Sequence, residues 1–220
     1  MGHLISMYIL RMYWRTLRVF GFTRSSWDKQ FESGVWDRGP RSLNTIKRVS
    51  GLCAGGKLIE FGCGGGSLPF LVPRNCYSEY IGYDISEVAI KIAKRRARQE
   101  GLENIYFAQC DMAKWNGAND VSLIVAEECL YYLSPANVER FLQQCLRSIC
   151  LGGLILVIVH SSSKHARTLD VCRRVCRVED EAVIGSRTYL TLAAVRESVV
   201  EGRDPSVPIS VGHVASLQLE

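Results

Sequence analysis

Four glycines lie within five residues in the stretch LIEFGCGGGSLPFL, which covers Leu58 to Leu71. Glycine loses more backbone freedom on folding than any other residue, so this density after an apolar run needs a cause. A strand, a glycine turn and a helix N-terminus together bring backbone amides close to a ligand, and a Cβ at Gly62, Gly64 or Gly66 would obstruct the turn or the ligand. An ordinary tight turn can also read GxGxG, so the loop alone marks only a candidate site.

Acidic residues stand at the ends of the next two apolar runs. Asp84 ends EYIGYD about twenty residues after the loop, where a carboxylate can accept hydrogen bonds from both hydroxyls of a ribose. Asp111 follows the third run, in AQCDMAKW. With the glycine loop, these positions predict a site for an adenosine moiety.

The spacing of the glycines separates the possible adenosine ligands. The loop lacks GxxxxGK[ST], which excludes a P-loop, and Ser67 stands where a dinucleotide site would have its third glycine. Glu60, two residues before the first glycine, would sit poorly against a pyrophosphate but well near the ammonium of a methionine moiety. An NAD-dependent enzyme is therefore the weaker alternative.

The predicted elements bring these residues to one edge of a sheet. The expected strands are KLIEFG, EYIGYD, NIYFAQCD, DVSLIVAEE, LILVIVH, VEDEAVI and SRTYLTLAAV. Helices are expected over 1–22, 26–34, 41–52, 67–72, 86–101, 134–152 and 164–176, with Ser26, Ser86 and Ser134 as N-caps. This alternation predicts an α/β fold with a doubly wound, mostly parallel seven-stranded sheet and N-terminal helices. Ligands of such folds bind at the carboxyl ends of the strands.

The chain resembles the class I S-adenosylmethionine-dependent methyltransferases over Lys57 to Val195. The segments IEFGCGGGSLPFL, YIGYDIS, FAQCDMAKW and DVSLIVAEECLYYL follow one another in that family's order and spacing. AEECLYYLSP and the upstream WDKQFESGVWDR resemble more narrowly the small-molecule enzymes of the nodulation type and of bacterial polysaccharide and secondary-metabolite gene clusters. The resemblance implies a Rossmann-like fold, S-adenosylmethionine as cofactor, and methyl transfer to an O or N atom of a small molecule, such as a sugar or glycolipid intermediate.

The resemblance also implies a set of cofactor-binding residues. These are Glu60, Gly62, Cys63, Gly64, Gly66, Asp84, Ile85, Asp111, Met112 and Glu127. The residues of the glycine loop, with Glu60, are expected around the methionine end, and Asp84 at the ribose. Ile85, Asp111 and Met112 are expected around the adenine, and Glu127 beside the sulfonium.

Methyl transfer from a sulfonium is an in-line displacement, for which alignment of the acceptor supplies much of the rate. A hydroxyl acceptor also needs a general base. His160, at the end of the fifth strand, and Glu128, after the fourth, are the candidate catalytic residues; alternatively, His160 bonds a loop and Glu128 holds a helix start. Trp36, Tyr131 and Tyr132 are expected to bind the acceptor, with packing as their alternative role.

The composition is that of an ordinary globular protein, with 47% hydrophobic and 22% charged residues. The net charge of +5 does not establish a nucleic-acid partner. AEECLYYL also differs from the NPPY pattern that clamps a flipped base, so we expect no nucleic acid to bind. A nucleic-acid methyltransferase and a non-catalytic protein that binds S-adenosylmethionine stay open as alternatives.

The nine cysteines form no CxxC pair and no zinc-finger spacing, so no metal is expected, and they read as reduced thiols of a cytoplasmic protein. Residues 1–22 are apolar but contain Arg11, Arg15 and Arg18 on one helical face. We expect this helix to pack on the domain, with contact to an anionic membrane as the alternative.

Three segments follow from this reading. Residues 1–52 form a helical extension and candidate active-site lid, 53–201 the domain that binds S-adenosylmethionine, and 202–220 a loose tail. The sequence leaves the oligomeric state open.

Overall fold

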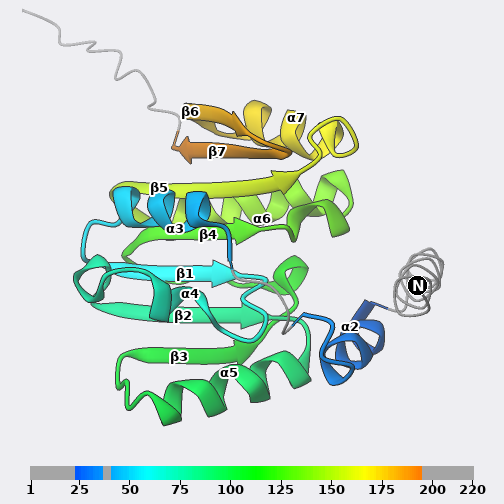
Figure 1. Cartoon of the computed structure of the whole chain (residues 1–220). Coiled ribbons are helices and arrows are strands. Elements are labelled where there is room, and N and C mark those ends of the chain that lie inside the picture. The colour runs from blue at the N-terminus through cyan, green and yellow to red at the C-terminus, as the bar shows by residue number, and fades with distance from the viewer. Residues whose placement is uncertain (1–22, 37–40, 195–220) are drawn as a thin grey trace, which may run out of the picture.

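The computed structural model describes residues 23–36 and 41–194. In this part of the chain a seven-stranded sheet has the order β3-β2-β1-β4-β5-β7-β6 (Figure 1). The strands are β1 (Lys57–Phe61), β2 (Glu79–Asp84), β3 (Ile105–Gln109), β4 (Val121–Glu127), β5 (Ile149–His160), β6 (Arg177–Ile184) and β7 (Arg187–Ala193). Strand β7 is antiparallel to both of its neighbours, and the other pairs are parallel. The prediction of a doubly wound, mostly parallel seven-stranded sheet is confirmed.

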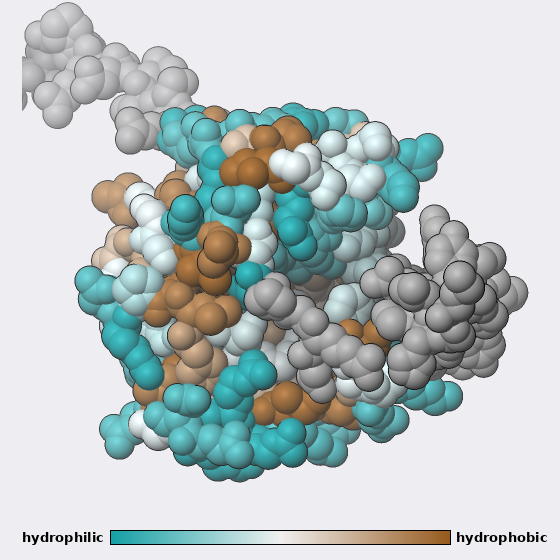
Figure 2. All heavy atoms as spheres, in the orientation of Figure 1, coloured by the Kyte–Doolittle hydropathy of each residue, from teal (hydrophilic) through white to brown (hydrophobic). Residues whose placement is uncertain are grey.

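Helices cover both faces of the sheet. They are α2 (Thr23–Glu32), α3 (Leu43–Leu52), α4 (Leu68–Leu71), α5 (Glu87–Gln99), α6 (Pro135–Ser148) and α7 (Ala166–Val175). One core cluster joins α3, α4 and α5 to the sheet, and a second joins α6 and α7 to the opposite face. Helix α2 lies beyond the carboxyl ends of the parallel strands (Figure 1). Figure 2 shows apolar groups on the face that carries α3 and α4, where Leu43 and Leu71 are exposed.

Local sequence signals set most of the helix ends. Ser86 Oγ accepts a hydrogen bond from Ala89 N at 3.2 Å, and Ser134 Oγ accepts one from Asn137 N at 3.3 Å, so both predicted caps are confirmed. The prediction for Ser26 is wrong, because α2 already includes Thr23 and Ser26 lies inside it.

The predicted end of the helix expected over 134–152 is also wrong. Helix α6 ends at Ser148 rather than at Gly152, and β5 begins at Ile149. Ile149 has extended backbone angles and pairs with Val121 of β4. Pairing with the neighbouring strand therefore overrides the helical pattern of these residues.

Packing explains why residue 66 is a glycine. Its φ is +68°, and a Cβ there would lie 2.6 Å from Phe107 Cζ and 2.7 Å from the Cβ of Ala93. It does not line the cavity described below, unlike Gly62 and Gly64. Its place in the cofactor-binding set stays a prediction.

We expect Gly66→Ala to lower the free energy of unfolding far more than Gly101→Ala. Gly101 has a similar φ of +63°, but a Cβ there would meet no atom within 4 Å. Gly101→Ala should therefore lower the free energy of unfolding by only about 1–2 kcal/mol, the penalty for placing alanine in the left-handed backbone conformation. Gly66→Ala should cost roughly 1–3 kcal/mol more, because the added methyl overpacks the core. Urea denaturation of both variants measures the difference, and equal losses would contradict the packing role.

The ends of the chain lie outside the described residues. These include the expected N-terminal helix with its three arginines, and the expected C-terminal tail. Within 23–36 and 41–194, no helix is long and apolar enough to cross a membrane. Helix α3, from the predicted N-terminal extension, places Val49 in the core beneath the sheet.

Candidate functional site

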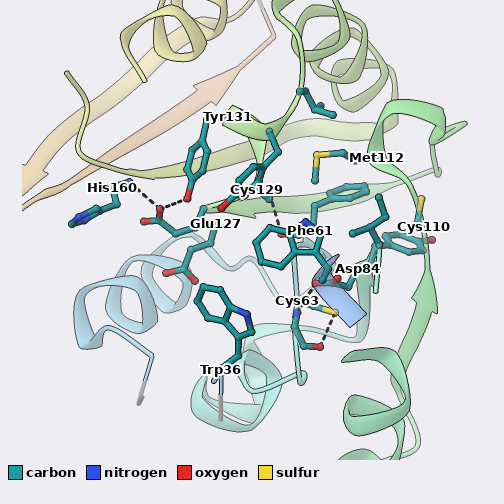
Figure 3. A pocket seen from close by; sticks show the side chains of 18 of the residues that line it. Trp36, Phe61, Cys63, Asp84, Cys110, Met112, Glu127, Cys129, Tyr131 and His160 are labelled. Carbon is teal, nitrogen blue, oxygen red and sulfur yellow. Dashed lines mark hydrogen bonds between the residues drawn. The ribbon is translucent and has the colours of Figure 1, made fainter. Parts of the chain in front are cut away.

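A cavity of about 960 Å³ lies at the carboxyl ends of the parallel strands. Its volume is at the upper end of the range for ligand pockets, enough for a nucleoside cofactor together with a small acceptor. Figure 3 shows Asp84, Cys63 and Met112 on one side of it, with Tyr131 and His160 on the other. Of the predicted site residues, those that line it are Trp36, Gly62, Cys63, Gly64, Asp84, Ile85, Asp111, Met112, Glu127, Glu128, Tyr131, Tyr132 and His160.

The glycine loop and Asp84 form a hydrogen-bonded unit. Asp84 Oδ2 accepts from Gly64 N at 2.9 Å, and Oδ1 accepts from Ser86 N at 2.9 Å. Gly62 and Gly64 both have positive φ, and a Cβ on Gly62 would lie 3.0 Å from the Cβ of Cys129. A carboxylate has about four acceptor sites, so Asp84 keeps capacity for hydroxyl groups of a ligand. Burial raises the pKa of Asp84, while the amides of Ser86 and Gly64 oppose that rise.

The wall beside Asp84 comes from β2, β3 and the turn after β3. Ile85 and Met112 line it, together with Cys110, a residue that the sequence analysis left out. Asp111 also lines it, and its Oδ1 accepts from Ala113 N at 3.0 Å, so one oxygen serves the local turn. Burial raises the pKa of Cys110 to about 11.

Arg41 lies between two carboxylates at the ends of β1 and β4. Its Nη2 is 2.7 Å from Glu60 Oε1, and its Nη1 donates to Glu127 Oε2. Thr45 Oγ1 donates to the other oxygen of Glu127 at 2.9 Å. Arg41 and Glu127 line the cavity, whereas Glu60 is fully buried and lies behind them. The carboxylate of Glu60 contacts Arg41 and accepts from Tyr80 Oη, and its place around the methionine end stays a prediction.

The protonation of this cluster follows from burial and charge. Burial lowers the pKa of Arg41, but the carboxylates of Glu60 and Glu127 outweigh it and the pKa is raised overall. Burial raises the pKa of Glu60, with Arg41 and Tyr80 acting against that rise. With both acids ionised, one cation and two anions leave a net charge of −1 beside the cavity.

Sequence reasoning missed Arg41, which it placed only at the start of a helix. A signal was available in the strand KLIEFG, where an acid stands among apolar residues. A buried carboxylate needs a cationic or hydrogen-bonding partner, so Glu60 predicts that some cation must reach the end of β1. Which cation does so depends on the packing of α3, and the local sequence does not specify it.

Glu128 ties the end of β4 to the end of β5. It adopts a φ of 55°, unusual for a residue other than glycine. Its Oε2 accepts from Tyr131 Oη at 2.9 Å and from His160 N at 3.1 Å, and its backbone N donates to Ile158 O at 2.9 Å. Its Oε1 forms no hydrogen bond to the described residues and lies 3.4 Å from Arg187 Nε. Glu128 thus has a structural role, and both of its carboxylate oxygens face groups of the protein.

His160 lies at the margin of the cavity. Its Nδ1 lies 2.9 Å from Ser186 Oγ, and Figure 3 shows its ring pointing away from Phe61 and Cys129. The catalytic role predicted for His160 and Glu128 stays a prediction.

Aromatic side chains also line the cavity. Trp27 packs edge-on against Tyr132 with ring centroids 5.2 Å apart, and Trp36 lies 5.9 Å from Trp27. Tyr131 stacks on His165 with centroids 3.9 Å apart. His165 therefore lines the cavity, although sequence reasoning left it out of the site.

Helix α2 brings the first of these aromatics to the cavity. Asp28 Oδ1 accepts from Ser86 Oγ at 2.6 Å and from Val88 N at 3.3 Å, at the N-terminus of α5. Arg24 also pairs with Glu87 at 3.3 Å. These contacts hold the predicted lid segment over the site. Asp37 and the following residues to 40 lie outside the described residues.

Residues 58–153 match the family model described as "Methyltransferase domain". This part of the chain, less than half of it, therefore resembles a methyltransferase domain. A ubiquinone biosynthesis O-methyltransferase from Acinetobacter baumannii (strain ACICU) is 33% identical over 125 residues, which are 55% of this chain and 52% of the relative. The chain thus spans about half the length of these curated relatives.

Solved structures share the fold. A TehB-like S-adenosylmethionine-dependent methyltransferase from Corynebacterium glutamicum has a TM-score of 0.59 at 16% identity, covering 78% of this chain and 97% of its own. The N-methyltransferase NodS from Bradyrhizobium japonicum, in complex with S-adenosylhomocysteine, has a TM-score of 0.57 at 17% identity, covering 68% and 83%. The likeness to class I methyltransferases of the nodulation type is confirmed at the level of fold.

The residues present fit S-adenosylmethionine, the cofactor that the sequence predicts. The carboxylate of Asp84 offers acceptors for ribose hydroxyls, next to backbone that no Cβ obstructs at Gly62 and Gly64. The carboxylate of Glu127 on the cavity wall suits the positive charges of a methionine moiety with a sulfonium. Within the described residues, no group of side chains is placed to hold a metal ion.

Proposed function

We propose that this protein transfers the methyl group of S-adenosylmethionine to an O or N atom of a small molecule, with a sugar or glycolipid intermediate as the proposed class. The observation that carries the proposal is the pairing of Asp84 with the Gly64 amide at the wall of a cavity large enough for two ligands. The free thiols of all nine cysteines support a cytoplasmic location.

Different residues of the chain would bind the cofactor and align the acceptor. When bound, the cofactor supplies an electrophilic methyl group on a sulfonium. Asp84 and the glycine loop would hold the nucleoside, and Glu127, fixed by Arg41 and Thr45, would lie at the methionine end. The aromatic wall of Trp36, Tyr131 and Tyr132 would exclude water and align the acceptor, which is the main requirement of an in-line displacement.

A hydroxyl acceptor would also have to lose its proton. Glu128 is the proposed proton acceptor. Its Oε2 is engaged by Tyr131 Oη and His160 N, and its Oε1 is buried 3.4 Å from Arg187 Nε, so an acceptor hydroxyl would have to displace one of these contacts. A neutral amine acceptor would not require this step. A nucleic-acid acceptor has no specific observation in its favour.

The test is calorimetric titration with S-adenosylhomocysteine beside NAD, combined with alkylation of cysteines by N-ethylmaleimide at pH 9. Cys53, Cys110 and Cys150 are partly exposed, but only Cys110 of these lines the cavity. Saturating S-adenosylhomocysteine should slow the labelling of Cys110 and leave Cys150 unchanged, and NAD should change neither. Because the pKa of Cys110 is raised to about 11, labelling is slow and rates are compared by mass spectrometry.

Failure of S-adenosylhomocysteine to bind would contradict the proposal. Binding without protection of Cys110 would contradict the assignment of the cofactor to this cavity. Binding without methyl transfer to any compound of a broad acceptor panel would favour the non-catalytic alternative.

A further inference from the structure

We propose that the methyl acceptor carries an oxyanion, a carboxylate or a phosphate, and that Arg187 and Lys164 bind it. This inference rests on the proposed function and deepens it, because it names a chemical feature of the acceptor. It concerns what we call the acceptor end of the cavity, defined by its lining residues Glu128, Tyr131, Tyr132, Leu133, His160, Ser161, Lys164, His165 and Arg187.

The fold brings basic side chains to this end from separate elements. Arg187 of β7 stands directly opposite His160 of β5 in the antiparallel register, so their side chains emerge on the same face of the sheet. Lys164 and His165 follow in the loop after β5.

Backbone hydrogen bonds fix that loop against the β6–β7 turn. Ser161 N donates to Ser186 O at 2.7 Å, and Lys164 N donates to Ser161 O at 3.0 Å. His165 N donates to Ser162 O at 3.1 Å. The positions of the basic residues relative to β7 are thus set by the backbone, before any ligand binds.

Charge at this end is unbalanced toward positive. Arg187 and Lys164 are cations there, and Glu128 is the one carboxylate among the residues that define it. Lys164 pairs with no carboxylate of the described residues, and its side chain is exposed. Burial lowers the pKa of His165, so its ring is neutral near pH 7 and the positive charge at this end comes from Arg187 and Lys164. An anionic group on the acceptor would complement this end of the cavity.

The guanidinium of Arg187 has a hydrogen-bond donor without a partner among the described residues. Its Nε is buried without a hydrogen bond, and the contact of its ion pair with Glu128 is 3.4 Å long, from Nε to Oε1. Glu128 is itself held by Tyr131 and His160, so it can orient the guanidinium without consuming its outer donors. A guanidinium fork matches the two oxygens of a carboxylate or phosphate.

The experiment measures binding of inorganic phosphate and of acetate to the full chain by equilibrium dialysis with radiolabelled anions, at constant ionic strength set with chloride. The two anions separate a phosphate-bearing from a carboxylate-bearing acceptor. Each is measured with and without saturating S-adenosylhomocysteine. We expect one anion to bind per chain, with affinity falling about tenfold in Arg187→Gln and in Lys164→Gln.

Lys114→Gln is the matched control. Lys114 is 84% exposed and lies in the turn after Asp111, so its loss removes the same charge away from the acceptor end. Its substitution should leave anion binding unchanged. Lys164 is exposed, so Lys164→Gln remains informative even if Arg187→Gln disturbs the fold.

Absence of binding of both anions at tens of millimolar would overturn the proposal. So would an equal loss in Lys114→Gln. These outcomes are distinct from failure of the proposed function, which appears as absence of S-adenosylhomocysteine binding whatever the anions do.

Discussion

Replacing Arg41 with alanine is expected to lower the free energy of unfolding by about 3–5 kcal/mol, because it leaves the buried carboxylate of Glu60 without its cation. The side chain of Arg41 is 10% exposed, and it contacts Glu60 Oε1 at 2.7 Å and Glu127 Oε2. Without it, two acids face each other at the ends of β1 and β4. Urea denaturation at pH 7.5 measures the loss.

The loss should depend on pH in a defined direction. Burial raises the pKa of Glu60, and in Arg41→Ala the cation no longer opposes that rise. An acid whose pKa is higher in the folded than in the unfolded state stabilises the fold below the unfolded pKa, and this contribution is lost as the pH rises through the folded pKa. The variant should therefore be closest to the wild type near pH 5 and fall further below it toward pH 8.

Arg24→Ala supplies the control for this substitution. Arg24 pairs with Glu87 at 3.3 Å on the surface, where both side chains are about half exposed. Its loss should change the free energy of unfolding by less than about 1 kcal/mol at any pH. Adding Glu60→Gln to Arg41→Ala should restore part of the stability and remove the pH dependence. A pH-independent loss in Arg41→Ala would show that only packing was removed.

The sheet and its binding edge could be predicted from the sequence because their signals are local. The apolar runs, the capping serines and the glycine loop each act within a few residues. Asp84 follows from the same logic, since it ends a strand adjacent to the strand that carries the loop. The prediction that the helix continues past Ile149 is wrong because Ile149 pairs with Val121 of a neighbouring strand, a partner distant in the sequence.

The site was less predictable, because parts of it depend on contacts between distant elements. Arg41 and Glu127 are 86 positions apart in the chain, and no pattern in the local sequence predicts that they pair. His165 enters the cavity wall through its stacking on Tyr131, which depends on how the loop after β5 folds back. Glu60 was recognised as important, but its side chain is buried behind Arg41 rather than on the cavity wall.

Asp84→Asn is expected to weaken S-adenosylhomocysteine binding by about 10- to 100-fold, the cost of losing hydrogen bonds to a charged acceptor. Asparagine keeps the volume but offers an NH₂ where the carboxylate accepts from Gly64 N or Ser86 N. The substitution should also lower the stability of the loop, so the free energy of unfolding is measured beside the calorimetric affinity. Asp111→Asn is the matched comparison, since Asp111 lines the same cavity and one of its oxygens bonds only its own turn. It should cost less affinity.

The pH dependence of binding distinguishes a direct role of the Asp84 carboxylate from a purely structural one. Burial raises the pKa of Asp84 above that of an ordinary aspartate, so its acceptor sites begin to be lost at a higher pH as the solution is acidified. Wild-type affinity for S-adenosylhomocysteine should therefore fall as the pH is lowered toward this pKa. The affinity of Asp84→Asn should be lower throughout but flat over the same range, because asparagine does not titrate. If both proteins lose affinity in parallel on acidification, another group controls binding, and the loop held by Asp84 only shapes the cavity.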